Sequence, residues 1–173
     1  MTSETPRHIV LIGMMGVGKS TIGNKLATAM GRQFLDLDAA IEQSAERTIA
    51  QIFASDGEHG FRDREAIALR EAVASSEPLV IATGGGIVDG PAAGELDRQC
   101  CVWLTARLDT LVARVGAGQG RPLLSGDIEA TLTDLLARRA PNYEKAATLT
   151  VAVDDQSVSA IVANLCKALE TLC

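Results

Sequence analysis

The chain has 173 residues, of which 47% are hydrophobic and 3% aromatic, and its formal net charge is −6 at pH 7. This length and composition suit one domain with an aliphatic core. The acidic balance argues against DNA or RNA as a partner, because binding a phosphate backbone requires clustered positive charge. The segment 1–7 is polar, unlike a signal peptide, and no apolar run approaches the roughly 18 residues of a membrane span. We therefore expect a cytoplasmic protein without a membrane partner, organised as one domain over 1–173 with 1–7 as a loose tail.

The cysteines and histidines do not suggest a disulfide framework or a metal site. No two of the four cysteines form a Cys-x-x-Cys pair, and two are adjacent in an apolar run. This pattern favours reduced thiols over structural disulfides or zinc, and two histidines are too few for a histidine-rich site. The residues concerned are Cys100, Cys101, Cys166, Cys173, His8 and His59.

The first part of the chain alternates between strand-like and helix-like segments. Residues 8–12 form an apolar, β-branched run that predicts a strand. The segment 18–30 has apolar residues at intervals of four, which predicts a helix, and Gly31 is placed as its C-cap. A second short strand is expected over 33–37.

The middle of the chain predicts a long helical region followed by two buried strands. Residues 39–75 are mostly helix-like, with breaks near Gly57 and Gly60. The runs 79–82 and 100–104 are continuously apolar, which is typical of strands buried on both faces of a parallel sheet.

The last part of the chain completes an α/β pattern. Residues 108–115 and 128–139 have helical periods, and the second of these helices is expected to break at the proline that follows it. Between them lies a glycine-rich segment, about 116–126, without any period. The run 149–153 predicts the last strand and 158–172 an amphipathic closing helix. The alternation of strands and helices indicates one parallel sheet covered on both faces.

A phosphate-binding loop follows the first predicted strand. The stretch GMMGVGKST meets the pattern G-x-x-x-x-G-K-[ST]. Glycines let successive backbone N–H groups point at an anion, and the N-terminus of the next helix adds the positive end of its dipole. Lys19 is placed to reach the terminal phosphates and Ser20 to ligate Mg²⁺. The residues expected to bind the nucleotide here are Gly13, Met15, Gly16, Val17, Gly18, Lys19, Ser20 and Thr21.

Two classes of phosphate-using protein are compatible with this loop: a GTPase switch and a small-molecule kinase. The chain has neither the Asn-Lys-x-Asp guanine motif nor an Asp-x-x-Gly switch motif. A kinase needs an acceptor pocket, a polar group facing the acceptor hydroxyl and a lid that excludes water. The remaining motifs supply candidates for each, which favours the kinase.

Asp36 and Asp38 lie at the end of the second predicted strand. In an extended chain, residues two apart point to the same face. The carboxyl ends of parallel strands meet in one crevice, which places both carboxylates beside the phosphate loop. One carboxylate can hold a water of the Mg²⁺ shell, and the other can accept hydrogen bonds from a substrate hydroxyl. The alternative is that Asp38 only caps a helix that starts near Ala39.

Arg62 is the candidate for binding an anionic substrate. A guanidinium binds a carboxylate through two parallel hydrogen bonds, and Asp63 or Glu65 could orient it. The alternative is a solvated, charged helix face, which such runs usually form.

Three further segments are candidates for the rest of a kinase site. The glycines at 84–86 follow a buried strand, which suggests close approach of the backbone to a ligand, although a flexible turn is the alternative. Arg121 lies in the glycine-rich segment, which has the character of a lid whose arginine closes onto the phosphates, unless it is only a surface loop. Arg139 precedes Pro141, where a single arginine is more often a surface residue.

Together these segments resemble the shikimate kinases, P-loop enzymes with a nucleoside-monophosphate-kinase-like fold. The resemblance extends from about residue 8 to 153. Its specific part consists of Phe-Leu-Asp-x-Asp at 34–38, Gly-Phe-Arg at 60–62, Gly-Gly-Gly at 84–86, Arg-Pro-Leu-Leu at 121–124 and Arg-x-Pro-x-Tyr at 139–143.

The resemblance implies a fold and an activity. The fold would be three αβα layers around a five-stranded parallel sheet of order 2-3-1-4-5, with a mobile lid. The activity would be direct in-line transfer of the γ-phosphoryl group of ATP to the 3-hydroxyl of shikimate, on the route to chorismate and aromatic amino acids. Mg²⁺ would be required, and the family tends to be monomeric.

The resemblance also implies roles for individual residues. Substrate binding would fall to Asp38, Arg62, Gly84, Gly85, Gly86 and Arg139, catalysis to Lys19, Asp38 and Arg121, and Mg²⁺ binding to Ser20 and, through water, Asp36. The adenine contacts would come from Arg114 and Gln156, although the stretch 154–156 is acidic and lacks the basic or proline character common there.

Two other functions stay open at this point. A kinase for another polyol acid, such as gluconate, would share the loop and the lid but would not be expected to repeat both arginine motifs. A ligand-sensing regulator built on this fold would be expected to carry a DNA-binding segment, for which the chain has no room before His8.

Overall fold

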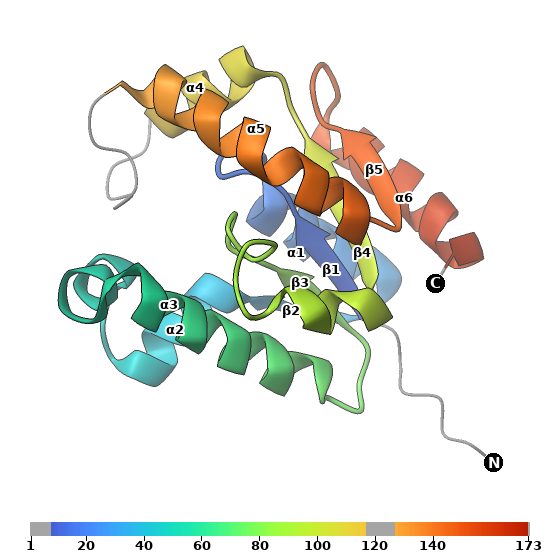
Figure 1. Ribbon diagram of the computed structural model, residues 1–173. Coiled ribbons are helices and arrows are strands. Elements are labelled where there is room, and N and C mark those ends of the chain that lie inside the picture. Colours follow the sequence, from blue (N-terminus) through green and yellow to red (C-terminus); the bar gives the residue numbers. More distant parts are fainter. Residues whose placement is uncertain (1–7, 117–126, 173) are drawn as a thin grey trace.

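The computed structural model describes residues 8–116 and 127–172, and within them five parallel strands form one sheet (Figure 1). The strand order is β2-β3-β1-β4-β5, so the expected order 2-3-1-4-5 is confirmed. The strands are β1 Ile9–Ile12, β2 Gln33–Asp36, β3 Leu79–Ala82, β4 Cys100–Thr105 and β5 Leu149–Ala152.

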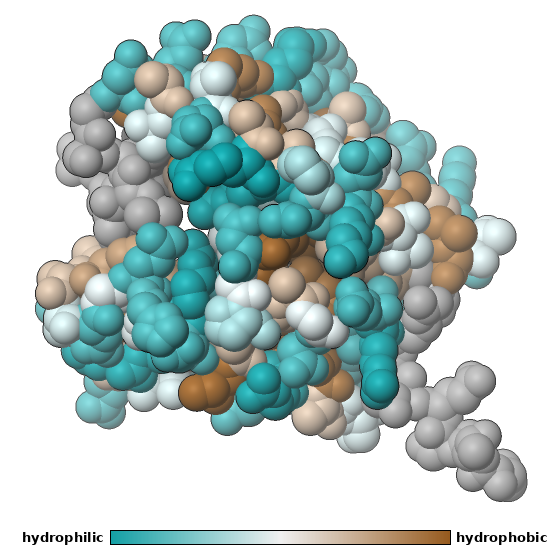
Figure 2. Space-filling view, viewed as in Figure 1, coloured by the Kyte–Doolittle hydropathy of each residue, from teal (hydrophilic) through white to brown (hydrophobic). Residues whose placement is uncertain are grey.

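Helices cover both faces of this sheet, as an α/β fold requires. In Figure 1, α5 crosses in front of the sheet, whereas α1 lies behind it, and α1 packs against α6. The helices are α1 Lys19–Met30, α2 Leu37–Ala45, α3 Ile49–Val73, α4 Leu108–Gly116, α5 Ile128–Ala146 and α6 Val158–Leu172, with the 3₁₀ helix η1 at Ala93–Arg98. The same face of the molecule is mostly hydrophilic over α3 and α5 (Figure 2). The expected three-layer arrangement is therefore present.

The core lies around β1, the central strand, and its neighbour β3, both of which are buried on both sides. Every residue of β1 has zero exposure, and all of β3 is buried. These strands read as continuous apolar runs because no residue of either faces water. The helix α1 begins at Lys19, directly after the phosphate loop, and Gly31 ends it in the left-handed region with φ 64°, as predicted.

The segment expected as one helical region over 39–75 is two helices. It breaks at Glu46, which has φ 52°, and α3 restarts after Thr48, whose side chain forms a capping box with Gln51. This break was not expected, because no glycine or proline marks it. The break expected near Gly57 is present as a kink within α3, where Gly57 has φ 71° and ψ −176°, whereas the break expected near Gly60 is wrong, since the chain is helical there.

The helix α5 continues through Pro141 to Ala146, so the prediction that it ends at the proline is wrong. Proline inside a helix removes one hydrogen bond and is unfavourable. The tertiary structure offsets this cost through Tyr143, which has zero exposure and stacks on Trp103 with ring centroids 5.6 Å apart. The packing of Tyr143 therefore holds the last turns of α5 in place.

Cys100 is disulfide-bonded in the structure, so the expectation of four reduced thiols is wrong at that position. None of the helices in the described parts of the chain has the length and apolar character needed to cross a membrane.

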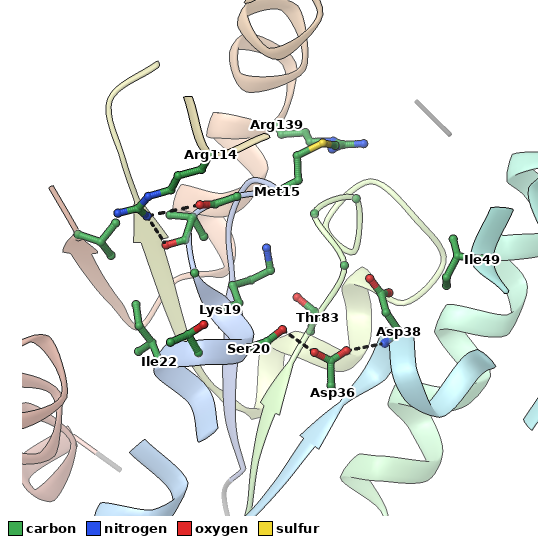
Figure 3. Close-up of a pocket in the computed structure, with 18 of the residues that line it drawn as sticks. Met15, Lys19, Ser20, Ile22, Asp36, Asp38, Ile49, Thr83, Arg114 and Arg139 are labelled. Atoms are coloured by element: carbon green, nitrogen blue, oxygen red, sulfur yellow. Dashed lines mark hydrogen bonds between the residues drawn. The ribbon is translucent and has the colours of Figure 1, made fainter. Parts of the chain in front are cut away.

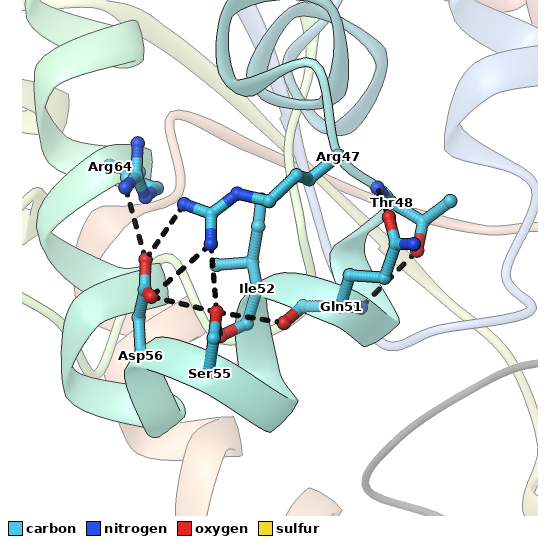
Figure 4. Close-up of polar contacts among 7 residues, drawn as sticks. All are labelled: Arg47, Thr48, Gln51, Ile52, Ser55, Asp56 and Arg64. Carbon is cyan, nitrogen blue, oxygen red and sulfur yellow. Dashed lines mark hydrogen bonds and ion pairs between the residues drawn. The ribbon is translucent and has the colours of Figure 1, made fainter.

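A cluster of ion pairs joins the two halves of α3 across its kink (Figure 4). The carboxylate of Asp56 accepts hydrogen bonds from Arg47 at 3.2 Å, from Arg64 at 3.0 Å and from Ser55 at 2.7 Å. Arg47 precedes α3, Asp56 ends its first half and Arg64 lies in its second half. The hydrogen bonds from Ser55, Arg47 and Arg64 lower the pKa of Asp56 to about 2.

We predict that Asp56→Asn lowers the thermal midpoint at pH 7 and that this loss depends on pH. A carboxyl group whose pKa is lowered in the folded state, here from 3.8 to about 2, stabilises the fold above pH 4 and loses that effect as the pH falls toward 2. Thermal unfolding of both proteins between pH 7 and 2.5 measures the difference. Asp63→Asn is the matched control, since Asp63 pairs with the exposed His59. A difference that stays constant over this range would contradict the assignment.

Candidate active site

One cavity of about 740 Å³ opens at the carboxyl ends of β1, β2 and β3 (Figure 3). It brings together most of the residues that the sequence singled out. The predicted residues that line it are Met15, Gly16, Val17, Gly18, Lys19, Ser20, Thr21, Asp36, Asp38, Arg62, Gly84, Gly85, Gly86, Arg114, Arg139 and Gln156. The phosphate loop and the arginines thus share one site, although Arg139 lies more than 100 residues from the loop in the sequence.

The lysine of the phosphate loop binds the backbone of the same loop. Lys19 donates hydrogen bonds to the carbonyl oxygens of Gly13, at 2.8 Å, and Met14, at 2.9 Å. Gly16 and Gly18 have φ of 81° and 102°, values that L side chains rarely adopt. Gly18 immediately precedes α1, so the N–H groups of the loop and the helix N-terminus face the same space, as an anion site requires.

Ser20 and Asp36 form the oxygen pair expected for a metal. The Ser20 hydroxyl donates to Asp36 Oδ2 at 2.5 Å. The other oxygen of Asp36 accepts from the backbone N–H groups of Asp38 and Ala39, at 3.1 and 3.3 Å, so Asp36 is the N-cap of α2. From the sequence, Asp38 was a candidate for the cap of this helix, but the structure gives that role to Asp36. Asp36 therefore fixes both the loop and the helix that carries Asp38.

Asp38 lies in the first turn of α2 and not on an extended strand, so the argument that two alternate residues share a strand face was wrong. The two carboxylates still point to one cavity, because the helix turns the chain there (Figure 3). Asp38 Oδ1 is buried and has no hydrogen-bond partner in the described residues. Burial, and then the charge of Asp36, raises the pKa of Asp38, while Lys19 and Arg62 oppose that shift. Such a carboxylate is available to a ligand.

Arg62 is buried beside this carboxylate, with 8% exposure, and is not a solvated surface residue. Its guanidinium donates to Glu65 at 2.7 Å and to Glu58 at 3.4 Å. Of the two orienting residues that the sequence offered, Glu65 is therefore the one in contact, whereas Asp63 is exposed and pairs with His59. Burial raises the pKa of Glu65, and the charge of Arg62 opposes that shift.

The three glycines after β3 leave room for charged groups. A Cβ atom on Gly84 would lie 2.6 Å from Glu65 Oε1 and 3.3 Å from Asp38 Oδ1, and one on Gly86 would overlap the guanidinium of Arg62. Alanine at either position would therefore displace a charged side chain. The close neighbours of this backbone are the protein's own charged groups, and its approach to a ligand stays a prediction.

Arg139 is also buried, with 3% exposure. Its Nε atom donates to Asp89 Oδ2 at 2.7 Å. Asp89, Thr83 and Tyr143 are neighbours that the sequence did not identify as functional. Thr83 donates to the carbonyl oxygen of Leu11 at 2.9 Å, and the hydroxyl of Tyr143 donates to that of Gly85. No sequence signal could have paired Asp89 with Arg139, since the two are 50 residues apart and neither belongs to a shared periodic pattern.

The two residues expected to contact the adenine, Arg114 and Gln156, donate hydrogen bonds to backbone carbonyl oxygens. Arg114 donates to the carbonyl oxygens of Val17 at 3.2 Å and Gly16 at 3.4 Å, and Gln156 donates to that of Ala152 at 2.8 Å. The acidic stretch beside Gln156 is paired, since Asp155 accepts from Arg107 at 2.7 Å. Arg121 and nearly all of the expected lid at 116–126 lie outside the described residues.

The sequence model of one family, described as shikimate kinase, matches residues 15–170 of this chain. The chain belongs to the shikimate kinase family. A shikimate kinase of Symbiobacterium thermophilum is 43% identical over 169 residues, which is 94% of this chain and 96% of that one. The five motifs that suggested this family therefore identified it correctly.

Solved structures agree with this assignment. A shikimate kinase from Acinetobacter baumannii, in complex with shikimate, has a TM-score of 0.91 at 36% identity and covers 97% of this chain and 95% of its own. A gluconokinase from Sinorhizobium meliloti has a TM-score of 0.56 at 22% identity, with 96% and 97% coverage, and shows only a shared fold. The family assignment thus favours shikimate over gluconate as the acceptor.

We predict that Gly86→Ala raises the KM for shikimate by about tenfold to a hundredfold, because the new methyl group would displace the guanidinium of Arg62. The KM for ATP should change little. Steady-state kinetics with each substrate varied in turn measures both constants. The matched control is Gly94→Ala, since a Cβ on Gly94 meets no atom of the described residues within 4 Å. An unchanged KM for shikimate would contradict the packing described here.

Proposed function

We propose that this chain transfers the γ-phosphoryl group of ATP to the 3-hydroxyl of shikimate, giving shikimate 3-phosphate and ADP on the route to chorismate and aromatic amino acids. One observation carries the proposal. Asp38 Oδ1 and Arg139 Nη1 are buried at the same cavity as the phosphate loop, and neither has a hydrogen-bond partner within the described chain. Buried polar atoms are almost always paired, so these atoms are suited to a polar ligand.

The acceptor would be bound by complementary charge. Shikimate carries one carboxylate and three hydroxyls, and two buried arginines beside one aspartate form a suitable complement. Arg62 and Arg139 would bind the carboxylate, since guanidinium groups match its planar geometry. Asp38 and the backbone at Gly84, Gly85 and Gly86 would hold the ring hydroxyls. The part of the cavity beside the phosphate loop would then be free to bind the nucleotide.

The transfer itself would proceed in line and without a covalent enzyme intermediate. The oxygen of the 3-hydroxyl attacks the γ-phosphorus, the bond from that phosphorus to the bridging oxygen breaks, and ADP leaves. Asp38 would orient the attacking hydroxyl and stand ready to take its proton, although a loose transition state needs little help from a base. Lys19 would neutralise charge on the phosphates. Arg121 is proposed to do the same from the lid at about 116–126.

The oxygen pair of Ser20 and Asp36 fits Mg²⁺. A hydroxyl and a carboxylate are hard oxygen donors, and Mg²⁺ is usually held by one or two such groups together with substrate phosphates and water. When bound, the ion would neutralise charge on the phosphates of ATP, with Ser20 as a direct ligand and Asp36 acting through water.

Further proposals concern the nucleotide base and the state of the protein. Arg114 and Gln156 would contact the adenine, which is supported by their position in the cavity. The protein would act as a cytoplasmic monomer of one domain, with 1–7 as a tail. The net charge of −6 supports the absence of a nucleic-acid partner.

The proposed activity predicts ADP release that depends on shikimate. Purified protein with ATP and Mg²⁺ is expected to release ADP when shikimate is added, and not with gluconate or without an acceptor. The variant Lys19→Ala should release little under any condition, because it loses the charge at the phosphates. Release with gluconate instead would overturn the acceptor, and ATP binding without release would favour the ligand-sensing regulator.

A second prediction concerns Asp38. The variant Asp38→Asn should lower kcat by at least about a hundredfold while the affinity for ATP changes little. Because burial raises the pKa of Asp38, the acid limb of kcat/KM for shikimate should lie above pH 3.8, the ordinary value for aspartate. The rate should fall as the pH drops through that pKa, since the protonated carboxyl cannot accept the hydroxyl proton. Equal losses of turnover and ATP affinity, or an unchanged acid limb in the variant, would count against this role.

A further inference from the structure

The carboxylate of Asp89 is a hydrogen-bond partner of Arg139, and it comes from the loop after the three glycines. The side chain of Tyr143 also interacts with Arg139. Arg139 uses Nε for this contact at 2.7 Å. Its Nη1 atom remains buried and without a hydrogen-bond partner among the described residues. A Cβ built on Gly85 would lie 3.6 Å from Nη1, so this nitrogen lies over the glycine loop that lines the cavity. Asp89 therefore contributes to the direction of the guanidinium by binding its Nε edge.

Asp89 is itself fixed from two sides. Its second oxygen accepts from Asn142 Nδ2 at 3.1 Å, and its backbone N–H donates to the carbonyl oxygen of Gly86 at 3.0 Å. Tyr143 adds a hydrogen bond to the carbonyl oxygen of Gly85. Arg139, Asn142 and Tyr143 are spaced three and four residues apart on α5, so they share one helix face. That helix face contacts the loop at two points. Tyr143 binds Gly85, and Arg139 and Asn142 bind the carboxylate of Asp89.

The two arginines of the site are oriented differently. Arg62 is oriented by Glu65, three residues further along the same helix and itself fully buried. Arg139 is oriented by a residue of another segment, and the side chain of Asp89 is 38% exposed. A change at Asp89 therefore removes the carboxylate that pairs with Arg139 and leaves that buried guanidinium without its acidic partner.

We propose that Asp89 is a positioning residue, held by Asn142, that directs the guanidinium of Arg139 toward the carboxylate of the acceptor. This inference rests on the proposed function. It assigns Asp89 an effect on acceptor affinity that acts through Arg139 and not through the nucleotide. A purely structural role for Asp89, as a brace of the loop, would instead affect stability and both substrates alike.

The experiment measures shikimate binding by titration calorimetry, together with the KM values for shikimate and ATP. Asp89→Ala is expected to weaken shikimate binding by about tenfold, the usual size for losing a hydrogen bond to a charged group. Asp89→Asn, which keeps an acceptor oxygen but no charge, should lose less. The KM for ATP should stay within about twofold in both variants. The matched control is Asp134→Ala, which removes an exposed aspartate–arginine pair on the same helix and should change neither constant.

A double-mutant cycle with Arg139→Lys tests whether the effect passes through Arg139. If it does, Asp89→Ala should have little further effect in the Arg139→Lys background. An equal loss in both backgrounds, or unchanged shikimate affinity in Asp89→Ala, would overturn the proposal. Circular dichroism and the thermal midpoint verify that each variant is folded. Failure of the unmodified protein to bind shikimate would overturn the proposed function itself, which keeps the two failures distinct.

Discussion

The burial of charge around one cavity is the constraint on which the rest of this site depends. Lys19, Arg62, Glu65 and Arg139 are all buried, in a protein whose core is otherwise aliphatic. An isolated buried charge is very unfavourable, so each requires a partner close by. Lys19 uses the carbonyl oxygens of its own loop, Arg62 uses Glu65 and Arg139 uses Asp89.

The same constraint explains why the site is lined by backbone. Charged side chains can come together only where the backbone between them carries no bulky side chain. The glycines after β3 leave that space. A side chain at Gly84 or Gly86 would occupy the positions of Glu65 and Arg62. The loop is then held by Tyr143, whose burial also keeps α5 helical through Pro141. Core packing, loop position and arginine direction are thus parts of one arrangement.

In the proposed function, this arrangement would separate the two substrates by chemistry. The phosphate loop presents N–H groups and one lysine, whereas the acceptor end presents two guanidinium groups and one carboxylate of raised pKa. The kinked helix α3 forms part of the cavity wall. Its residues Phe53 and Phe61 line the cavity, and the centroids of their rings lie 4.8 Å apart. The helices α2 and α3, which carry Asp38 and Arg62, have a satellite core of their own around Ile41, Ile52 and Phe61.

The sequence by itself determined the α/β class, the phosphate loop with Lys19 and Ser20, and the family. It did so because these depend on local patterns: strand–loop–helix spacing, the glycines of an anion-binding turn, and apolar periods that match each element. It also located Gly31 as a cap, and it selected Arg62 and Arg139. The order of the strands followed from the family resemblance.

Only the tertiary structure decided how these parts meet. The role of Asp36 as helix cap, the place of Asp38 in the first turn of α2, the break at Glu46 and the continuation of α5 past Pro141 all depend on contacts with distant segments. Asp89 pairs with Arg139 across 50 residues, and no local pattern records such a pair. Local signals specify the type of each element and its chemistry, whereas the partner of a buried charge is set by packing in three dimensions.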